Sequence, residues 1–361
     1  MPIDPQARKD ILKFITEFRK NREIKDDSNV KIGFMNDDEE IGKIERLPTD
    51  IIGFDTLTGG GFIKGKINQI WGEEGCGKTT LIFKSIANFQ KNDPNFIANY
   101  QNNEKTLDKD YVTYNGIDKD RFVVGEFTSN EEVGDFCNFV TDPGSHISLS
   151  AFDTLQALSC EGELYKGTKE KSVSDNTMAL IPRMYSQFLR MYTSKSVGHL
   201  TLILASQVRM DLGSFIASKQ STGGNAIKHY NILTVEMQKA GMANWPGGKE
   251  NLTPKSFPVR LKIRKAKLMD RYEGNSIYIY FYKGAFEHKF NVVAISKDLG
   301  IHDGRSLKYS TEDNPSEVLE FKAKGFYDFY NKIPAEAIKY LEKKIPEEYT
   351  KSIMYDSQPE E

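Results

Sequence analysis

The feature that most constrains this chain is the stretch GEEGCGKT, which begins at Gly72 and matches the pattern G-x-x-x-x-G-K-[ST]. Gly72, Gly75 and Gly77 allow a tight turn that aims backbone N–H groups at phosphate oxygens. Lys78 adds a positive charge for the β- and γ-phosphates, and the Thr79 hydroxyl can ligate Mg²⁺. A β-like run, INQIW, precedes the loop and an amphipathic helical run follows it. The sequence therefore predicts a nucleotide-binding site.

From about residue 46 the chain alternates short β-like runs with helical segments, and this alternation predicts a mostly parallel sheet covered on both faces. The later runs follow one another more closely, which predicts an antiparallel extension of the sheet. The expected fold class is therefore α/β, a P-loop nucleotide-binding core. The β-like runs are KINQIWG, FIANYQ, RFVVGEF, ISLSAFD, LTLILASQ, ILTVEMQ, VRLKIRKAK and SIYIYFY.

The two ends of the chain differ from this core. Residues 4–24 carry apolar side chains at helical spacing, which predicts an amphipathic helix, and a short β-like island follows at Val30–Met35. This helix-plus-strand arm, residues 1–43, could pack on its own core or on a neighbouring subunit. The core is expected over 44–288. Beyond it, SEVLEFKAKGFYDFYNK and AEAIKYLEKKI have helical patterns, which predicts a small C-terminal domain with a polar tail over 289–361.

Composition excludes several classes of protein. The 361 residues contain 49 Lys and Arg against 51 Asp and Glu, so any basic surface for nucleic acid must be local. No window approaches the roughly 18 apolar residues of a membrane span, and the start, MPIDPQARKD, has no apolar signal core. Cys76, Cys137 and Cys160 are too few and too scattered for a disulfide framework or a zinc site. We expect a cytoplasmic protein with no membrane partner.

Three polar residues near the ends of β-like runs are candidates for chemistry beside the phosphate loop. Asp153 ends ISLSAFD, where a carboxylate could hold Mg²⁺ through water, cap the next helix, or do both. Glu104 follows FIANYQ and could orient an attacking water, although an exposed glutamate is usually a solvated surface residue. Gln207 ends LTLILASQ, where an amide could contact the γ-phosphate or merely cap the strand.

Taken together, these motifs resemble the RecA family of recombinases, bacterial or phage-encoded, from about Ile44 to Gly300. So many motifs in the same order are far more specific than a phosphate loop alone. The stretches that keep the family's order are GEEGCGKTT, Leu107-Asp108 with Tyr111, AFDTLQAL, PRMYSQFLR, LASQVRMDLG, STGGNAIKHY and IRKAK.

The resemblance implies ATP and Mg²⁺ as cofactors and gives a role to each matched position. Glu104 would activate water, Gln207 would sense the nucleotide, and a lysine pair would reach the neighbouring subunit's ATP. The residues with catalytic roles are Glu104, Lys78, Gln207, Lys265 and Lys267. The metal ligands are Thr79 and Asp153. The cofactor-binding residues, of which the last two embrace adenine, are Gly72, Glu73, Glu74, Gly75, Cys76, Gly77, Lys78, Thr79, Thr80, Asp108 and Tyr111.

Two DNA-binding loops of the family correspond to Glu161–Met178 and Arg209–Thr222. The first contains lysines around Tyr165, a combination that suits single-stranded nucleic acid, although a lysine-rich loop can also be a solvated surface. The second has apolar residues among Gly, Ser and Thr, and these would need a partner such as an unstacked base. The residues expected to contact DNA are Tyr165, Lys166, Lys169, Lys171, Met178, Arg183, Ser186, Arg190, Arg209, Leu212, Phe215, Thr222, Gly223, Gly224 and Asn225.

The chain also departs from the family pattern. Asn102 stands where an aspartate often precedes the catalytic glutamate, and the segment between the strand and Glu104 is two residues longer. The aromatic side chain that follows the matched Lys228 in bacterial members is His229 here. The C-terminal region matches poorly beyond ISKDLGI.

The resemblance implies an ATP-dependent DNA recombinase, a DNA-dependent ATPase that forms a helical filament on single-stranded DNA and pairs it with homologous double-stranded DNA in recombination and repair. The N-terminal arm would dock on the adjacent protomer, and single-strand-binding or loader proteins could be partners. A hexameric helicase or translocase is one alternative, against which the lysine pair and TGGNA argue. A non-catalytic paralogue that regulates filaments is another, against which the intact Lys78, Asp153 and Glu104 argue.

Overall fold

The computed structural model describes residues 5–24, 32–34, 36, 42–154, 165–166, 169–170, 180–195, 198–211, 218–221, 224–248, 255–267 and 273–355. The chain divides into two compact units, Met1–Glu45 and Arg46–Glu361. The domain boundaries expected after residues 43 and 288 stay predictions.

The first unit contains one helix, α1 (Pro5–Asn21), among its described residues, as the amphipathic spacing predicts. None of its side chains is buried, and Phe14 is 68% exposed. Of the β-like island at 30–35, only residues 32–34 are described, and they form no strand.

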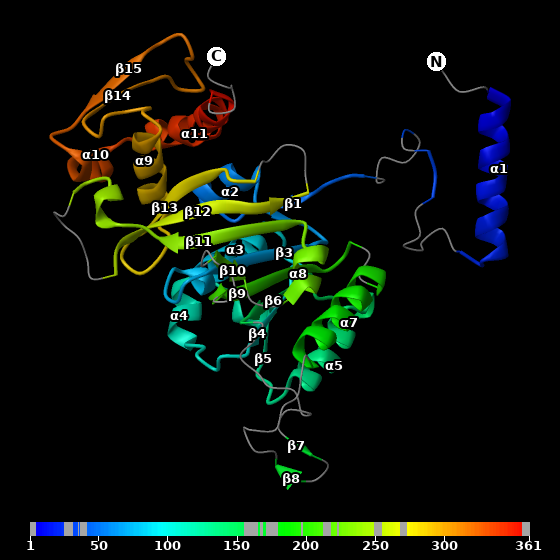
Figure 1. Ribbon diagram of the computed structural model, residues 1–361. Helices are drawn as coiled ribbons and strands as arrows, with labels where there is room; N and C mark the ends of the chain where they lie inside the picture. The colour runs from blue at the N-terminus through cyan, green and yellow to red at the C-terminus, as the bar shows by residue number, and fades with distance from the viewer. Residues whose placement is uncertain are drawn as a thin grey trace. The chain divides into compact units, whose positions relative to one another are not determined.

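The second unit is built on one central sheet with the strand order β13-β12-β11-β3-β9-β6-β4-β5, and β10 pairs with β9 (Figure 1). Neighbours from β11 to β5 are parallel, whereas β12 is antiparallel to both of its neighbours, β11 and β13. The α/β class with a mostly parallel sheet is therefore confirmed. The strands are β3 (Ile67–Gly72), β4 (Ala98–Asn102), β5 (Phe122–Gly125), β6 (Leu149–Asp153), β9 (Thr201–Asp211), β10 (Ser218–Ser221), β11 (Leu233–Lys239), β12 (Phe257–Ala266) and β13 (Ser276–Phe281).

Helices cover both faces of this sheet, and successive residues of the central strand β9 point alternately toward the two faces. Leu202 and Leu204 point into one core with α5 and α7, which Figure 1 shows side by side, while Ile203 and Ala205 point into the other with α3. Because both faces are buried, the strand reads as a continuous apolar run. The helices are α2 (Ile52–Thr58), α3 (Lys78–Asn92), α4 (Lys109–Tyr114), α5 (Asn130–Val140), α7 (Leu180–Lys195), α8 (Gly224–Tyr230), α9 (His288–Asp298), α10 (Phe326–Lys332) and α11 (Ala335–Tyr355).

The remaining strands form three small antiparallel pairs. They are β1 (Arg46–Leu47) with β2 (Phe62–Ile63), β7 (Tyr165–Lys166) with β8 (Lys169–Glu170), and β14 (Ser306–Tyr309) with β15 (Leu319–Lys322). Short 3₁₀ turns lie at Lys119–Arg121, Pro143–Ser145 and Met242–Asn244. Among the described residues, no helix has both the length and the apolar character to cross a bilayer.

The helix predicted over SEVLEFKAKGFYDFYNK is wrong in its first half. Leu319–Lys322 is strand β15, in which Leu319 and Phe321 are half-buried and Glu320 and Lys322 are exposed. This alternation has the period of a strand, and pairing with β14 buries its apolar side. The helix α10 begins only after Gly325.

Candidate active site

The phosphate loop joins β3 to α3, and its geometry requires glycine. Gly75 and Gly77 have φ angles of 65° and 92°, values that glycine adopts without strain. A Cβ on Gly72 would lie 2.2 Å from the carbonyl oxygen of Met237 on the neighbouring strand β11. Because α3 begins at Lys78, its free N–H groups border the loop and can bind phosphate.

The side chains of the loop differ in exposure. Glu73 is half-buried and Glu74 is exposed. Cys76 is fully buried, and burial raises the pKa of its thiol, which is typical of a core cysteine. Lys78 is 8% exposed, and its Nζ donates hydrogen bonds to the carbonyl oxygens of Gly72 (3.0 Å) and Glu73 (2.9 Å). Its ammonium group therefore lies within the loop itself.

A buried carboxylate lies at the start of α3. Asp153 ends β6, and its Oδ2 accepts hydrogen bonds from Thr79 Oγ1 (2.5 Å) and from the Tyr100 hydroxyl (2.9 Å). Burial raises the pKa of Asp153, while these two hydrogen bonds oppose the shift. A hydroxyl and a carboxylate are hard oxygen ligands of the kind that Mg²⁺ prefers. The described residues contain no cluster of three or more His, Cys, Asp or Glu side chains fit for a metal, which Mg²⁺ bound to phosphates does not need.

An exposed carboxylate lies beside this pair. Glu104 follows β4, and its Oε1 accepts hydrogen bonds from Thr154 Oγ1 (3.0 Å) and Gln207 Nε2 (3.1 Å). The three residues follow or lie on β4, β6 and β9, adjacent parallel strands that all point toward one edge of the sheet. Two neutral donors thus orient the Glu104 carboxylate without neutralising it.

The segment between β4 and Glu104 is attached to the end of β6. Asn103 donates through its backbone N–H to the Asp153 carbonyl oxygen and through Nδ2 to the Thr154 carbonyl oxygen, both at 3.1 Å. Asn102 donates from Nδ2 to Glu126 Oε1 at 2.5 Å. Asn102 therefore helps to fix the base of this segment.

The two residues expected at adenine lie on either side of the start of α4. Asp108 is exposed and caps this helix, accepting a hydrogen bond from the Asp110 N–H at 2.8 Å. The Tyr111 hydroxyl lies 2.5 Å from Thr80 Oγ1, which places Tyr111 beside the phosphate loop. Its ring is stacked on Tyr114, with the centroids 6.3 Å apart.

Lys265 lies at the end of β12 and Lys267 directly follows this strand, and both side chains contact α8. Lys265 Nζ donates to the Lys228 carbonyl oxygen, and Lys267 Nζ donates to the His229 carbonyl oxygen at 3.0 Å. Burial and the charge of Lys267 lower the pKa of Lys265. Both ammonium groups thus meet the carboxyl end of α8, as a spacing of two on a strand allows.

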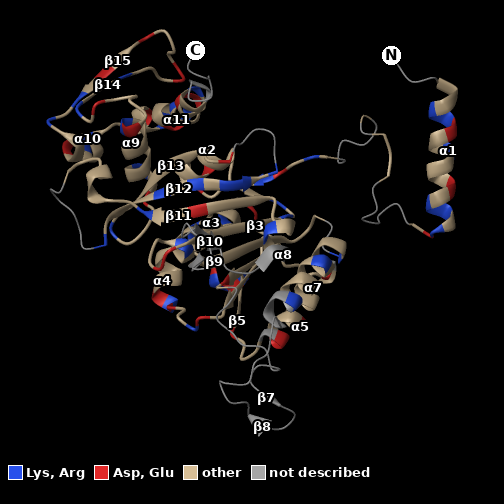
Figure 2. Cartoon of the chain, viewed as in Figure 1, with Lys and Arg blue, Asp and Glu red and all other residues tan. Residues whose placement is uncertain are grey.

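The residues expected to contact DNA are only partly described. Arg183 and Arg190 are exposed on α7, and Ser186 is half-buried between them. Figure 2 shows further Lys and Arg on α8 and β12. For six residues the backbone alone is described: Tyr165, Lys166, Lys169, Arg209, Gly224 and Asn225. Six more lie outside the described residues: Lys171, Met178, Leu212, Phe215, Thr222 and Gly223.

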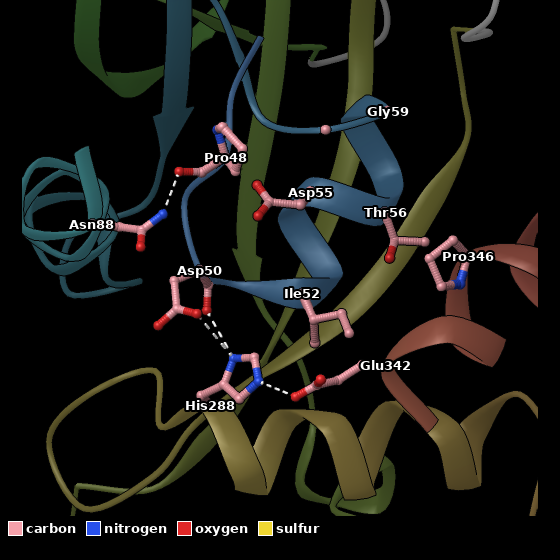
Figure 3. Close-up of a pocket in the computed structure, with 11 residues that line it drawn as sticks. Pro48, Asp50, Ile52, Asp55, Thr56, Gly59, Asn88, His288, Glu342 and Pro346 are labelled. Carbon is pink, nitrogen blue, oxygen red and sulfur yellow. Dashed lines mark hydrogen bonds and ion pairs between the residues drawn. The ribbon is translucent and has the colours of Figure 1, made fainter. Parts of the chain in front are cut away.

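A groove of about 550 Å³ lies among α2, α9 and α11. At its edge His288 connects two carboxylates (Figure 3): Nε2 is 2.7 Å from Glu342 Oε1, and Nδ1 is 3.3 Å from Asp50 Oδ1. Burial lowers the pKa of His288, but the hydrogen bond to Glu342 and the charge of Asp50 outweigh it and raise the pKa overall.

The chain is similar to known proteins over most of its length. The family model described as the RecA N-terminal domain matches residues 19–286. The chain is 28% identical over 297 residues to a protein named Protein RecA from Francisella tularensis subsp. novicida (strain U112), a match that covers 79% of each chain. It is 26% identical over the same length to Protein RecA from Francisella tularensis subsp. tularensis (strain WY96-3418), again with 79% of each chain covered.

Proposed function

The chain belongs to the RecA family, and from this membership we propose that it is an ATP-dependent DNA recombinase that forms filaments on single-stranded DNA and pairs them with homologous double-stranded DNA. The observation that carries the proposal is the convergence of Glu104, Asp153 and Gln207 beside the phosphate loop. A nucleotide-binding core without hydrolytic function would not need a carboxylate oriented by an amide from a third strand.

In this proposal Lys78, Thr79 and Asp153 bind Mg²⁺ and ATP. The cation, when bound, neutralises charge on the β- and γ-phosphates. Lys78 exchanges its contacts with the loop carbonyls for contacts with phosphate, because an ammonium group is a strong phosphate ligand. Tyr111 and Asp108 hold the adenine.

Glu104 acts as the base that orients the attacking water. Its exposure leaves room for water, and the hydrogen bonds from Thr154 and Gln207 limit its orientation. Because Gln207 contacts Glu104 and lies on the strand that continues toward the second DNA-binding loop, it is suited to link nucleotide state to DNA.

Assembly completes the site. Lys265 and Lys267 cap the ATP of the next subunit in the filament, and α1 docks on the adjacent protomer through its exposed apolar residues. Arg183 and Arg190 contact the DNA backbone. The protein would act in the cytoplasm, where single-strand-binding or loader proteins could assist it.

The deciding experiment is electron microscopy of the full chain on single-stranded DNA with a non-hydrolysable ATP analogue. We expect extended helical filaments with the wild type and none with Lys78→Ala, which removes the phosphate ligand. Closed rings would instead support a hexameric helicase. Filaments without DNA-stimulated ATP hydrolysis would support a non-catalytic paralogue.

A further inference from the structure

The carboxylate of Asp153 is contacted asymmetrically. Its Oδ2 accepts both the Thr79 hydroxyl at 2.5 Å and the Tyr100 hydroxyl at 2.9 Å, and no described residue donates to Oδ1. Asp153 is 5% exposed, so its carboxylate is largely shielded from solvent. Two hydroxyl groups from different elements, α3 and β4, therefore determine which oxygen is engaged and which is left available.

The Tyr100 side chain is held both by the packing of its ring and by the hydrogen bond of its hydroxyl group. It lies on β4 directly opposite Ala151 of β6, two residues before Asp153. Its ring is 2% exposed and packs edge-on against Phe83 of α3, with the centroids 5.0 Å apart, and on Phe122 of β5 at 5.9 Å. A phenylalanine would make the same ring contacts. The hydroxyl is thus the part of this side chain that packing does not explain.

We propose that Tyr100 is a positioning residue for the magnesium site: its hydroxyl holds Asp153 so that Oδ2 stays on Thr79 and Oδ1 stays available toward the cation. This inference rests on the proposed function, because it concerns how Mg²⁺·ATP binds. Groups that hold a metal-ligating carboxylate commonly change metal affinity by about 10–100-fold when they are removed. The sequence pattern alone does not reveal the role, because a tyrosine in a β-like run reads as a core residue.

Tyr100→Phe tests the proposal, since it removes one oxygen atom and keeps the ring. The binding of a non-hydrolysable ATP analogue to the full chain is measured by calorimetry at increasing Mg²⁺ concentrations, and also in EDTA. We expect the Mg²⁺ concentration at half-saturation to rise by about 10-fold, with the affinity in EDTA unchanged. An unchanged Mg²⁺ midpoint would overturn the proposal.

Tyr280→Phe is the matched control. Tyr280 is also fully buried and donates to a carboxylate, Asp298 Oδ2, but it lies on β13. Both variants should lose thermal stability because both leave a carboxylate with one hydrogen-bond donor fewer. Only Tyr100→Phe should shift the Mg²⁺ midpoint. An equal shift in both would mean a general loss of stability and would also overturn the proposal.

A double variant tests whether Tyr100 acts through Asp153. In an Asp153→Asn background, Tyr100→Phe should cause no further shift of the Mg²⁺ midpoint, because interacting residues are not additive. A full additional shift would assign Tyr100 a different role. If the wild type itself failed to bind the analogue with Mg²⁺, the proposed function would fail; if it bound and Tyr100→Phe bound identically, only this inference would fail.

Discussion

At the residue scale, the candidate site contains two carboxylates in different surroundings. Asp153 is buried and engaged by hydroxyl groups, whereas Glu104 is exposed and engaged by one hydroxyl and one amide. The buried Asp153 carboxylate has lost contacts with water that a bound cation could replace. The exposed Glu104 carboxylate can reach a water molecule. Different environments thus favour different roles for two similar side chains.

Glu104→Gln should slow ATP hydrolysis by about 10²–10⁴-fold, the usual effect of removing a general base. The amide oxygen of glutamine can still accept from Thr154 and Gln207, so nucleotide binding and filament assembly should persist, and filaments should last longer on DNA. The measurements are steady-state ATPase rates and filament lifetimes. Glu320→Gln, an exposed change on β15, should leave both unchanged. Turnover at the wild-type rate in Glu104→Gln would assign the role elsewhere, with Asp108 the next candidate.

The residues of the site were predictable from sequence to different degrees. Glu104, Asp153 and Gln207 come at or just after the ends of apolar runs, and parallel strands bring such ends together, so their proximity follows from pattern. Thr154 and Tyr100 carry no such signal. Their contacts depend on the register of β4 against β6, which pairs Asn102 with Asp153 and which the sequence alone does not determine.

At the scale of elements, β12 and α8 are joined by the lysine pair. Two ammonium groups repel each other, and the carbonyl end of α8 gives both a favourable partner. In the proposed filament the γ-phosphate of the next subunit's ATP must compete with these carbonyl groups. ATP bound to one subunit is therefore expected to alter the carboxyl end of α8 in another subunit. This helix begins beside the segment expected to form the second DNA-binding loop.

Lys265→Ala combined with Lys267→Ala should leave the monomer folded and able to bind ATP, but it should abolish DNA-stimulated hydrolysis and the extended filament. Lys262→Ala on the same strand is the control and should retain activity. Mixing the double variant with Lys78→Ala should restore some activity, because an intact phosphate loop can then meet intact lysines. Full activity of the double variant alone would contradict a shared site.

The connection of α9 to α11 through His288 should depend on pH. Because the pKa of His288 is raised in the folded chain, its stabilisation is complete below its unfolded value of 6.5 and is lost as the pH rises through the folded pKa. His288→Gln should therefore lower the melting temperature more at pH 5.5 than at pH 8.5. An equal loss at both values would show that the ion pairs with Asp50 and Glu342 contribute nothing.

His302→Gln is a control with the opposite sign. His302 is buried against Phe329, and burial lowers its pKa to about 4, so protonation of the unfolded chain destabilises the wild type as the pH falls. Its replacement should cost more stability at pH 8.5 than at pH 5.5. Differential scanning calorimetry of both variants over this range distinguishes the two histidines.

Helices and strands were predictable where their sequence pattern extends over many residues. The strand–helix alternation of the core and the antiparallel extension through β12 and β13 both appear in the structure. The helix predicted over the run that contains β15 is wrong because four residues fit the period of a helix or of a strand, and only the pairing with Ser306–Tyr309 decides between them. Short segments of this kind depend on their tertiary partners.

At the scale of the whole molecule, the first unit carries an apolar surface that its own described residues do not cover. Ile11, Leu12, Phe14 and Phe18 are all exposed on α1. Phe14→Gln should therefore leave the melting temperature almost unchanged but weaken self-association, measured by sedimentation velocity without DNA. Lys13→Gln, at the adjacent exposed position, is the control. Unchanged self-association in Phe14→Gln would mean that α1 is not the assembly surface.

A helix that leaves one subunit and docks on a different surface of the next has a consequence for geometry. Such a contact joins two different surfaces, so it can extend from subunit to subunit. A self-complementary contact, in contrast, is complete in a dimer. Each assembly would end with an undocked helix at one end and an unoccupied docking surface at the other. The two ends would then be chemically distinct, and growth and loss of subunits could proceed at different rates at each, which gives the assembly a direction.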